Sequence, residues 1–296
     1  MKRKLASASP PGMLPRLPDW VAGHDISIPE NAVFAAGAAL CALHLAQKVD
    51  TLPQALWRAR LALSASQNCA QFAGRPESVA QMRDEVHLLR PGETPGPAGA
   101  ILQAWLRATE RPISPASLQR ALPHLDKVQL DGWTAPYTAA PIAGAAQLVQ
   151  AILTDLPRAE TTALILADSA LSHALGWQYM VPLLASGLHR RDLMRCDTEL
   201  QQACARALVT SARHALTLAA DLTRKADALR AVAPKLRAKG AHPAVSLFLA
   251  QDALAPSRAL VPVMSDRAAR RFCERLVELG VVRELTGRES FRLYGV

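Results

Sequence analysis

The sequence is poor in aromatic residues and has no apolar run long enough to cross a bilayer. Phe, Trp and Tyr together make up 4% of the 296 residues. The longest apolar stretch, AVFAAGAALCALHLA (32–46), falls short of the roughly 20 residues that a membrane span needs, and it contains Gly and His. The opening stretch MKRKLASASPPGMLPRLP is charged but lacks the apolar core of a signal peptide. We therefore expect neither a membrane contact nor a secretion signal.

Cysteine is also scarce, and its distribution excludes a disulfide framework. The five cysteines stand at positions 41, 69, 196, 204 and 273, an odd number with no CxxC spacing. This pattern is typical of a protein from a reducing compartment, so we expect a cytoplasmic protein.

The motifs of several enzyme classes are missing. The sequence has no P-loop, GxGxxG, HExxH or GxSxG. The eight histidines are dispersed, and Asp168 and His173, five residues apart, make a poor pair of metal ligands. We therefore expect no catalytic residue, no metal and no cofactor. A catalytic site of unrecognised kind in the helical part stays open as an alternative.

Alanine and leucine dominate what is present. Half of the residues are hydrophobic, and Ala and Leu, the most frequent among them, are strong helix formers. Apolar residues recur at steps of three and four, whereas no alternating strand pattern occurs before residue 280. The sequence predicts an all-α fold in which a bundle of about seven to nine helices forms the main body.

The chain divides into three predicted parts: a Pro- and Ser-rich tail over residues 1–30, a helical body over 31–240, and a C-terminal unit over 241–296. The tail is expected to dock through Leu17 and Trp20. Residues 123–137 are expected to be loop, and Ser114 followed by Pro115 is a helix start. Helices are expected at 31–48, 53–73, 76–89, 98–109, 115–122, 141–153, 160–175 and 197–231.

The stretch RPGETPGPAG (90–99) is dense in Pro and Gly and must be a loop. Its backbone N–H groups, Arg90 and the N-terminus of the following helix suit an anion. A rigid connection between two helices explains the same residues, and we favour that structural interpretation.

The C-terminal unit predicts helices at 242–254, 255–264 and 265–280, then two strands, VVREL and SFRLYGV, around a turn at Gly287. Ser265 suits an N-cap, and Gly280 suits the position after a helix end. The apolar stripe of the third helix is Ala269, Phe272, Leu276 and Leu279. Three helices followed by a β-hairpin is the order of a winged helix-turn-helix.

Positive charge gathers at this end of the chain. Residues 206–296 hold 16 Lys or Arg against 8 Asp or Glu, whereas residues 1–205 hold 18 against 17. A basic third helix and hairpin suit phosphates and base edges. We expect a DNA-binding protein for transcriptional control or maintenance of a mobile element, in which the body either forms a homodimer or receives a signal. The expected DNA contacts are Arg267, Arg270, Arg271 and Arg275 on the helix, Arg283, Arg288 and Arg292 on the hairpin, and Lys235, Arg237 and Lys239 in the preceding segment.

Two other interpretations of the same residues stay open. The charges can solubilise an Ala-rich surface, and winged helices also serve as docking modules for proteins. Glu274 and Glu278, which share the helix face with the arginines, would weaken phosphate binding. The alternative function is therefore a non-catalytic protein-interaction module.

Three stretches resemble a known family. RPGETPGPAG (90–99), APKLRAKGA (233–241) and MSDRAARRFCERLVELGVVRELTGRESFRLYGV (264–296) are similar to the bacterial family DUF1403, a domain of unknown function. This resemblance implies a bacterial intracellular protein and no particular activity. The ending also resembles the winged helix that follows the catalytic domain of many Fic-type proteins. The Fic signature, a His followed by a Gly-Asn-Gly-Arg loop, is absent, so AMP transfer of that type is not expected.

Overall fold

Helices make up most of the described chain, which confirms the predicted all-α class. The computed structural model describes residues 13–23, 25–90, 92–134, 140–236 and 238–296. The elements that precede residue 241, here called the body, are α1 (Asp19–Gly23), α2 (Pro29–Ala46), α3 (Gln54–Phe72), α4 (Val79–His87), α5 (Pro97–Glu110), α6 (Pro115–Ala121), α7 (Lys127–Thr134), α8 (Pro141–Asp155), α9 (Glu160–Ala174), α10 (Leu184–Gly187), the 3₁₀ helix η1 (Asp192–Met194), α11 (Asp197–Val232) and the 3₁₀ helix η2 (Ala233–Lys235).

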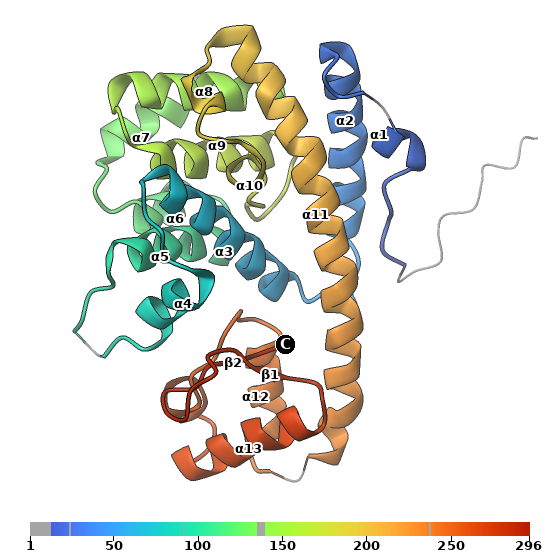
Figure 1. Ribbon diagram of the computed structural model, residues 1–296, viewed down its shortest axis with the longest axis vertical. Helices are drawn as coiled ribbons and strands as arrows, with labels where there is room; N and C mark the ends of the chain where they lie inside the picture. Colours follow the sequence, from blue (N-terminus) through green and yellow to red (C-terminus); the bar gives the residue numbers. More distant parts are fainter. Residues whose placement is uncertain (1–12, 24, 91, 135–139, 237) are drawn as a thin grey trace, which may run out of the picture.

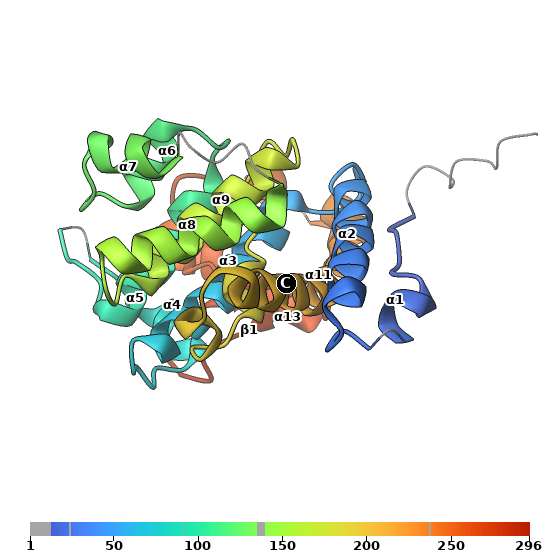
Figure 2. The same ribbon diagram turned by 90° about the horizontal axis from the view of Figure 1, so that it is seen from above.

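The long helix α11 is the element against which several other helices of the body pack (Figure 1). Helix α2 packs along one side of α11, and α8 and α10 pack against its upper part on the other side. Helix α3 pairs with α5, and α8 pairs with α9. Seen from above, α1 and α2 lie at one edge and α6 and α7 at the opposite edge (Figure 2). The predicted N-terminal docking segment corresponds to α1. The ring centroids of Trp20 on α1 and Phe34 on α2 lie 5.3 Å apart. Residues 1–12 of the predicted tail lie outside the described residues.

The number of helices and one loop were predicted wrongly. The described residues of the body hold eleven α-helices, α1 to α11, rather than seven to nine, because several are one or two turns long. Residues 123–137 were expected to be loop, yet α7 occupies part of them. A reciprocal cap starts it: Asp126 accepts a hydrogen bond from Gln129 N at 2.7 Å, and the Gln129 side chain accepts one from Asp126 N at 3.1 Å.

The Pro- and Gly-rich connection before α5 has a structural role, as the sequence favoured. The carboxylate of Glu85 on α4 accepts a hydrogen bond from Gly99 N at 2.6 Å. The anion that suits the N-terminus of α5 is thus a side chain of the protein itself. A Cβ on Gly99 would lie 2.6 Å from the Cβ of Glu85, so this close approach requires glycine.

An irregular segment, residues 180–188, crosses the interior of the body around α10. Asp168 on α9 is fully buried and accepts hydrogen bonds from three backbone N–H groups at the start of α10. Asn68 on α3 donates to two carbonyl groups near the end of α10, and Ser211 on α11 donates to the carbonyl of Leu183. These side chains pair buried backbone groups that the irregular segment would otherwise leave unsatisfied.

Residues 241–296 form a small unit of helices and a hairpin beneath the body (Figure 1). The first helix was predicted to reach residue 254 but ends at Phe248. A turn at residues 249–250 and a bend at Asp252 follow it, and the backbones of Leu254 and Tyr294 then exchange two hydrogen bonds of 2.8 and 2.9 Å. The elements of this unit are α12 (Ala241–Phe248), the π-helix η3 (Pro256–Leu260), α13 (Asp266–Glu278), β1 (Arg283–Glu284) and β2 (Tyr294–Gly295).

The hairpin strands are shorter than predicted. Strands β1 and β2 pair antiparallel over two residues each, with Arg283 opposite Gly295. Beyond this ladder the Glu284 carboxylate accepts hydrogen bonds from the backbone of Thr286 and Gly287 and from the Thr286 hydroxyl. These bonds fold the chain into a local turn, which ends the regular pairing.

Asp252 joins the C-terminal unit to the body. Its side chain is 4% exposed and forms ion pairs with Arg60 on α3 at 2.5 Å and with Arg83 on α4 at 2.6 Å. A second nitrogen of Arg83 donates to the other Asp252 oxygen at 2.9 Å, so this pair is bidentate. Arg60 also donates to the carbonyl of Val296 at 2.9 Å. One continuous apolar cluster includes buried residues of both parts.

No helix in the described ranges combines the length and the apolar character needed to cross a membrane.

We predict that Asp252→Ala lowers the free energy of unfolding by about 3–5 kcal/mol, because it leaves two largely buried arginines without a counter-charge. Asp227→Ala is the matched control, since Asp227 pairs with Arg230 at 3.1 Å where both side chains are well exposed. Its cost should stay below about 1 kcal/mol. Urea unfolding measures both, and equal small effects would show that Asp252 does not hold the unit in place.

The second prediction concerns Asp168. Burial raises the pKa of its carboxyl to about 7, against the lowering effect of the α10 N–H groups. The folded protein therefore binds this proton more tightly than the unfolded chain does. Its stabilising contribution is complete below the ordinary pKa of 3.8 and is lost as the pH rises through 7.

The variant Asp168→Asn has no such proton to lose. Between about pH 4 and pH 8, the free energy of unfolding of the wild type should therefore fall by up to about 4 kcal/mol relative to that of the variant. This magnitude follows because one pKa unit equals about 1.4 kcal/mol. Denaturant titrations at each pH measure this difference. A difference that stays constant over the range would contradict the assigned pKa.

Candidate nucleic-acid interface

Local signals in the sequence define α13. Ser265 is its N-cap and accepts a hydrogen bond from Ala268 N at 3.4 Å, and Gly280 follows its end with a φ of 69°. These two assignments confirm the predicted boundaries of the third helix. In Figure 1 α13 lies at the lower edge of the molecule, with the hairpin between it and the body.

The predicted apolar stripe of α13 is confirmed in three of its four positions. Ala269, Phe272 and Leu276 are buried, whereas Leu279 is 36% exposed. Leu279 lies past the last helical turn, where Gly280 redirects the chain. Val282, 2% exposed, takes the place in the core that was predicted for Leu279.

Three predicted arginines share one face of α13. Arg267, Arg271 and Arg275 follow one another at steps of four residues and line a groove of about 360 Å³. Leu236 and Ala238, from the segment that links η2 to α12, line the same groove. We call the surface formed by these five residues the groove face.

The groove face brings together two basic clusters that are far apart in the sequence. Lys235 and Lys239 are exposed, and each lies next to a residue that lines the groove. Arg237, the third predicted contact of this segment, lies outside the described residues. Three of the four predicted contacts of α13 thus line the groove, and the two described lysines of the linking segment are sequence neighbours of residues that line it.

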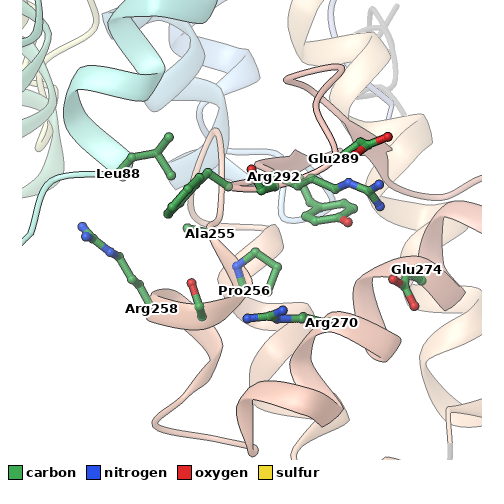
Figure 3. Close-up of a pocket in the computed structure, with 12 residues that line it drawn as sticks. Leu88, Ala255, Pro256, Arg258, Arg270, Glu274, Glu289 and Arg292 are labelled. Atoms are coloured by element: carbon green, nitrogen blue, oxygen red, sulfur yellow. The ribbon is translucent and has the colours of Figure 1, made fainter.

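Arg270 lies on a different side of α13 from Arg271, because consecutive helical residues are turned by about 100°. With Arg258 and Arg292 it borders a pocket of about 580 Å³ between α13, η3 and the hairpin (Figure 3). The three arginines come from three elements, and their guanidinium groups do not gather at one point. Glu274 and Glu289, on the rim of this pocket, offset much of its positive charge.

Ion pairs divide the arginines of α13 further. Within the described ranges, no carboxylate forms an ion pair with Arg267 or Arg271, and both side chains are exposed. They are therefore the arginines of α13 that can meet an anion without first losing a partner. The pairs within the helix are Arg270–Asp266 at 2.9 Å and Arg275–Glu278 at 2.8 Å.

The hairpin faces the body. Arg288 forms an ion pair of 2.7 Å with Asp84 on α4, and Leu285 packs against a small apolar cluster that includes Leu293. The side chain of Arg292 donates to the carbonyl of Arg288 at 2.8 Å. Either arginine would have to leave these partners before binding a phosphate.

The remaining predicted hairpin residue, Arg283, is exposed and lies near α11. The hydrogen bond from Lys225 contributes most to lowering the pKa of Asp221 on α11, and the charges of Arg224 and Arg283 contribute to the same shift. Arg224 and Lys225 form ion pairs with Asp221 at 2.5 and 2.8 Å. Much of the positive charge on the last turns of α11 is therefore already paired.

Sequence reasoning missed Arg258 and the ion pairs of Asp252. Arg258 lies in a short π-helix, which leaves no periodic signal in the sequence. Asp252 and its partner Arg83 are 169 positions apart in the sequence, and no local pattern marks such a contact. In the part of the chain that the structure describes, no three His, Cys, Asp or Glu side chains lie together as a metal site would require.

The fold and this surface define an α-helical protein with a basic C-terminal unit of helices and a hairpin. The chain belongs to the family described as "Protein of unknown function (DUF1403)", whose model matches residues 6–296. The match confirms the resemblance of the three sequence stretches and covers nearly the whole chain. None of the curated proteins compared with the chain matches it.

The position of the groove face depends on the packing of Phe272. This residue stands between the arginines of α13 in the sequence, and its side chain is 4% exposed. We expect Phe272→Ala to lower the free energy of unfolding by about 3–5 kcal/mol, because it opens a cavity under the helix. Thermal and urea unfolding measure the loss. Val277→Ala, at a position 38% exposed on the same helix, should cost much less; similar costs at both positions would mean that α13 is rotated.

Proposed function

We propose that the protein binds duplex DNA and that its C-terminal unit is a winged helix-turn-helix. The observation that carries this proposal is the groove face, where Arg267 and Arg271 stand exposed without ion-pair partners in the described part of the chain. Arginine suits such a role because its planar guanidinium binds phosphate and guanine with two parallel hydrogen bonds.

The order of elements supports the winged-helix assignment. Helix α12 is followed by the extended Leu254, the short helix η3, α13 and then the hairpin. Leu254 pairs with Tyr294 of the last strand, so the extended segment between the first two helices lies beside the hairpin. In a winged helix-turn-helix the third helix is the one that enters the major groove, which here is α13.

The structure supports different roles for the predicted DNA contacts. Arg267 and Arg271, in the first half of α13, are placed to meet base edges or phosphates. Lys235 and Lys239, beside the same groove, are exposed and suited to phosphates. Arg288 is held by Asp84, so we assign the main contacts to the helix and the linking segment rather than to the hairpin.

The second candidate function is the docking of a partner protein on the same unit. Val277 and Leu279 are 38% and 36% exposed near the end of α13, and Phe291 on the hairpin is 73% exposed. Exposed apolar side chains of this kind favour a protein contact over a nucleic-acid contact. Transcriptional control, maintenance of a mobile element and the homodimer all stay predictions.

The test is fluorescence anisotropy of a labelled duplex DNA titrated with the full-length protein at several salt concentrations. We expect Arg267→Ala/Arg271→Ala to weaken binding at least about tenfold, since each lost contact removes roughly 1–3 kcal/mol. The slope of log affinity against log salt should become shallower by about one unit for each of the two arginines that contacts a phosphate, and should stay the same for one that contacts a base edge.

The matched control is Arg190→Ala/Arg191→Ala, which removes two exposed arginines from the turn between α10 and η1. It has the same net charge as the test variant, so it should bind DNA like the wild type if the groove face is the interface. Equal losses in both variants would show that only overall charge matters. No binding by the wild type at low salt would reject the DNA function and leave protein docking.

A further inference from the structure

A further cavity, of about 340 Å³, lies where the C-terminal unit meets the body. Helices α3, α4 and α5 contribute to its walls, and the segment 250–252 closes it from the side of the C-terminal unit. Leu63, Leu102 and Leu106 give it an apolar wall. Its volume lies in the range of small-molecule sites, which are usually apolar with a few polar groups.

Arg58 is a charged group of this cavity that lacks a counter-charge in the described part of the chain. Its Nε donates to the carbonyl of Thr109 at 3.1 Å, and its guanidinium carbon lies 4.0 Å from the ring centroid of Tyr179. Within the described ranges, no carboxylate lies at ion-pair distance from Arg58. Burial lowers the pKa of this guanidinium, which reflects the cost of keeping its charge out of water.

The two carboxylates on the cavity wall already have partners. Asp252 is held by two arginines, as described above, and Glu110 forms an ion pair of 2.9 Å with Arg120. A second arginine of the wall, Arg107, donates to the amide oxygen of Gln103 at 3.0 Å and, like Arg58, forms no ion pair in the described part of the chain. The cavity thus combines an apolar wall with an excess of positive charge, which a bound anion would offset.

We propose that this cavity binds a small amphiphilic organic anion. Its carboxylate would lie at Arg58 and its hydrocarbon part on the leucine wall. A free phosphate would satisfy the arginine but leave the leucine wall in water, so we infer a carboxylate with an apolar tail. Since Gln251 and Asp252 also line the cavity, the ligand would contact both the body and the C-terminal unit. This proposal does not depend on DNA binding.

Isothermal titration calorimetry of the full-length protein without DNA tests it, with sodium octanoate as the probe. We expect saturable binding in the millimolar range or tighter, which is modest for about ten non-hydrogen atoms. Octanol tests the need for the charge, and inorganic phosphate tests the need for the tail. Both should bind at least about tenfold more weakly, since each lacks one of the two interactions.

Arg58→Met should weaken octanoate binding at least about tenfold, whereas Arg191→Met, which removes an exposed arginine, should leave it unchanged. A second variant, Gln103→Glu, guards against misfolding of the first. It places a carboxylate beside Arg107 and should weaken octanoate binding while circular dichroism shows an intact helical fold.

Absence of saturable octanoate binding, equal affinity for octanol, or full affinity in both cavity variants would each overturn the proposal. Phosphate that binds as tightly as octanoate would overturn the amphiphilic ligand class. None of these outcomes touches the DNA proposal, because the calorimetry contains no DNA and leaves the groove face unchanged.

Discussion

The ion pairs that Asp252 makes with Arg60 and Arg83 fix the position of the C-terminal unit. A buried carboxylate between two arginines is costly to separate, since each charge would lose its partner away from water. The pairs hold the chain just after α12, two residues before Leu254 forms its bridge with Tyr294. In this arrangement the hairpin contacts α4 of the body through Arg288, and α13 lies at the lower edge of the molecule. Both proposed surfaces depend on this arrangement.

The two surfaces are formed by different residues of one small unit. The groove face is formed by α13 and the segment before α12, whereas the cavity at Arg58 lies where the unit meets the body. Each is identified by the same physical feature, an arginine whose charge no carboxylate of the described chain offsets. Two of the four arginines of α13, Arg270 and Arg275, are instead paired with a carboxylate about one turn away, and so is Arg224 on α11.

Local chemistry made much of the fold predictable. Ser114 and Ser265 cap helices where the sequence indicates, and Gly280 ends α13, because each signal acts within four residues. The cap of α7, Asp126 with Gln129, has the same local form but stands in a stretch without apolar period. The basic residues were also evident from the sequence. Their separation into two faces and their pairing were not, because these depend on contacts between distant segments.

Helix α11 is a long, stiff connection between the body and the C-terminal unit. Its 36 residues correspond to about 54 Å, and it runs from the contact with α8 to the segment that leads into α12. At one end it is clamped among α2, α8 and α10, so a bend of only about 5° would carry the other end through about 5 Å. A small change in the packing of the body would therefore cause a larger displacement at the base of the C-terminal unit. The Asp252 ion pairs would oppose this displacement.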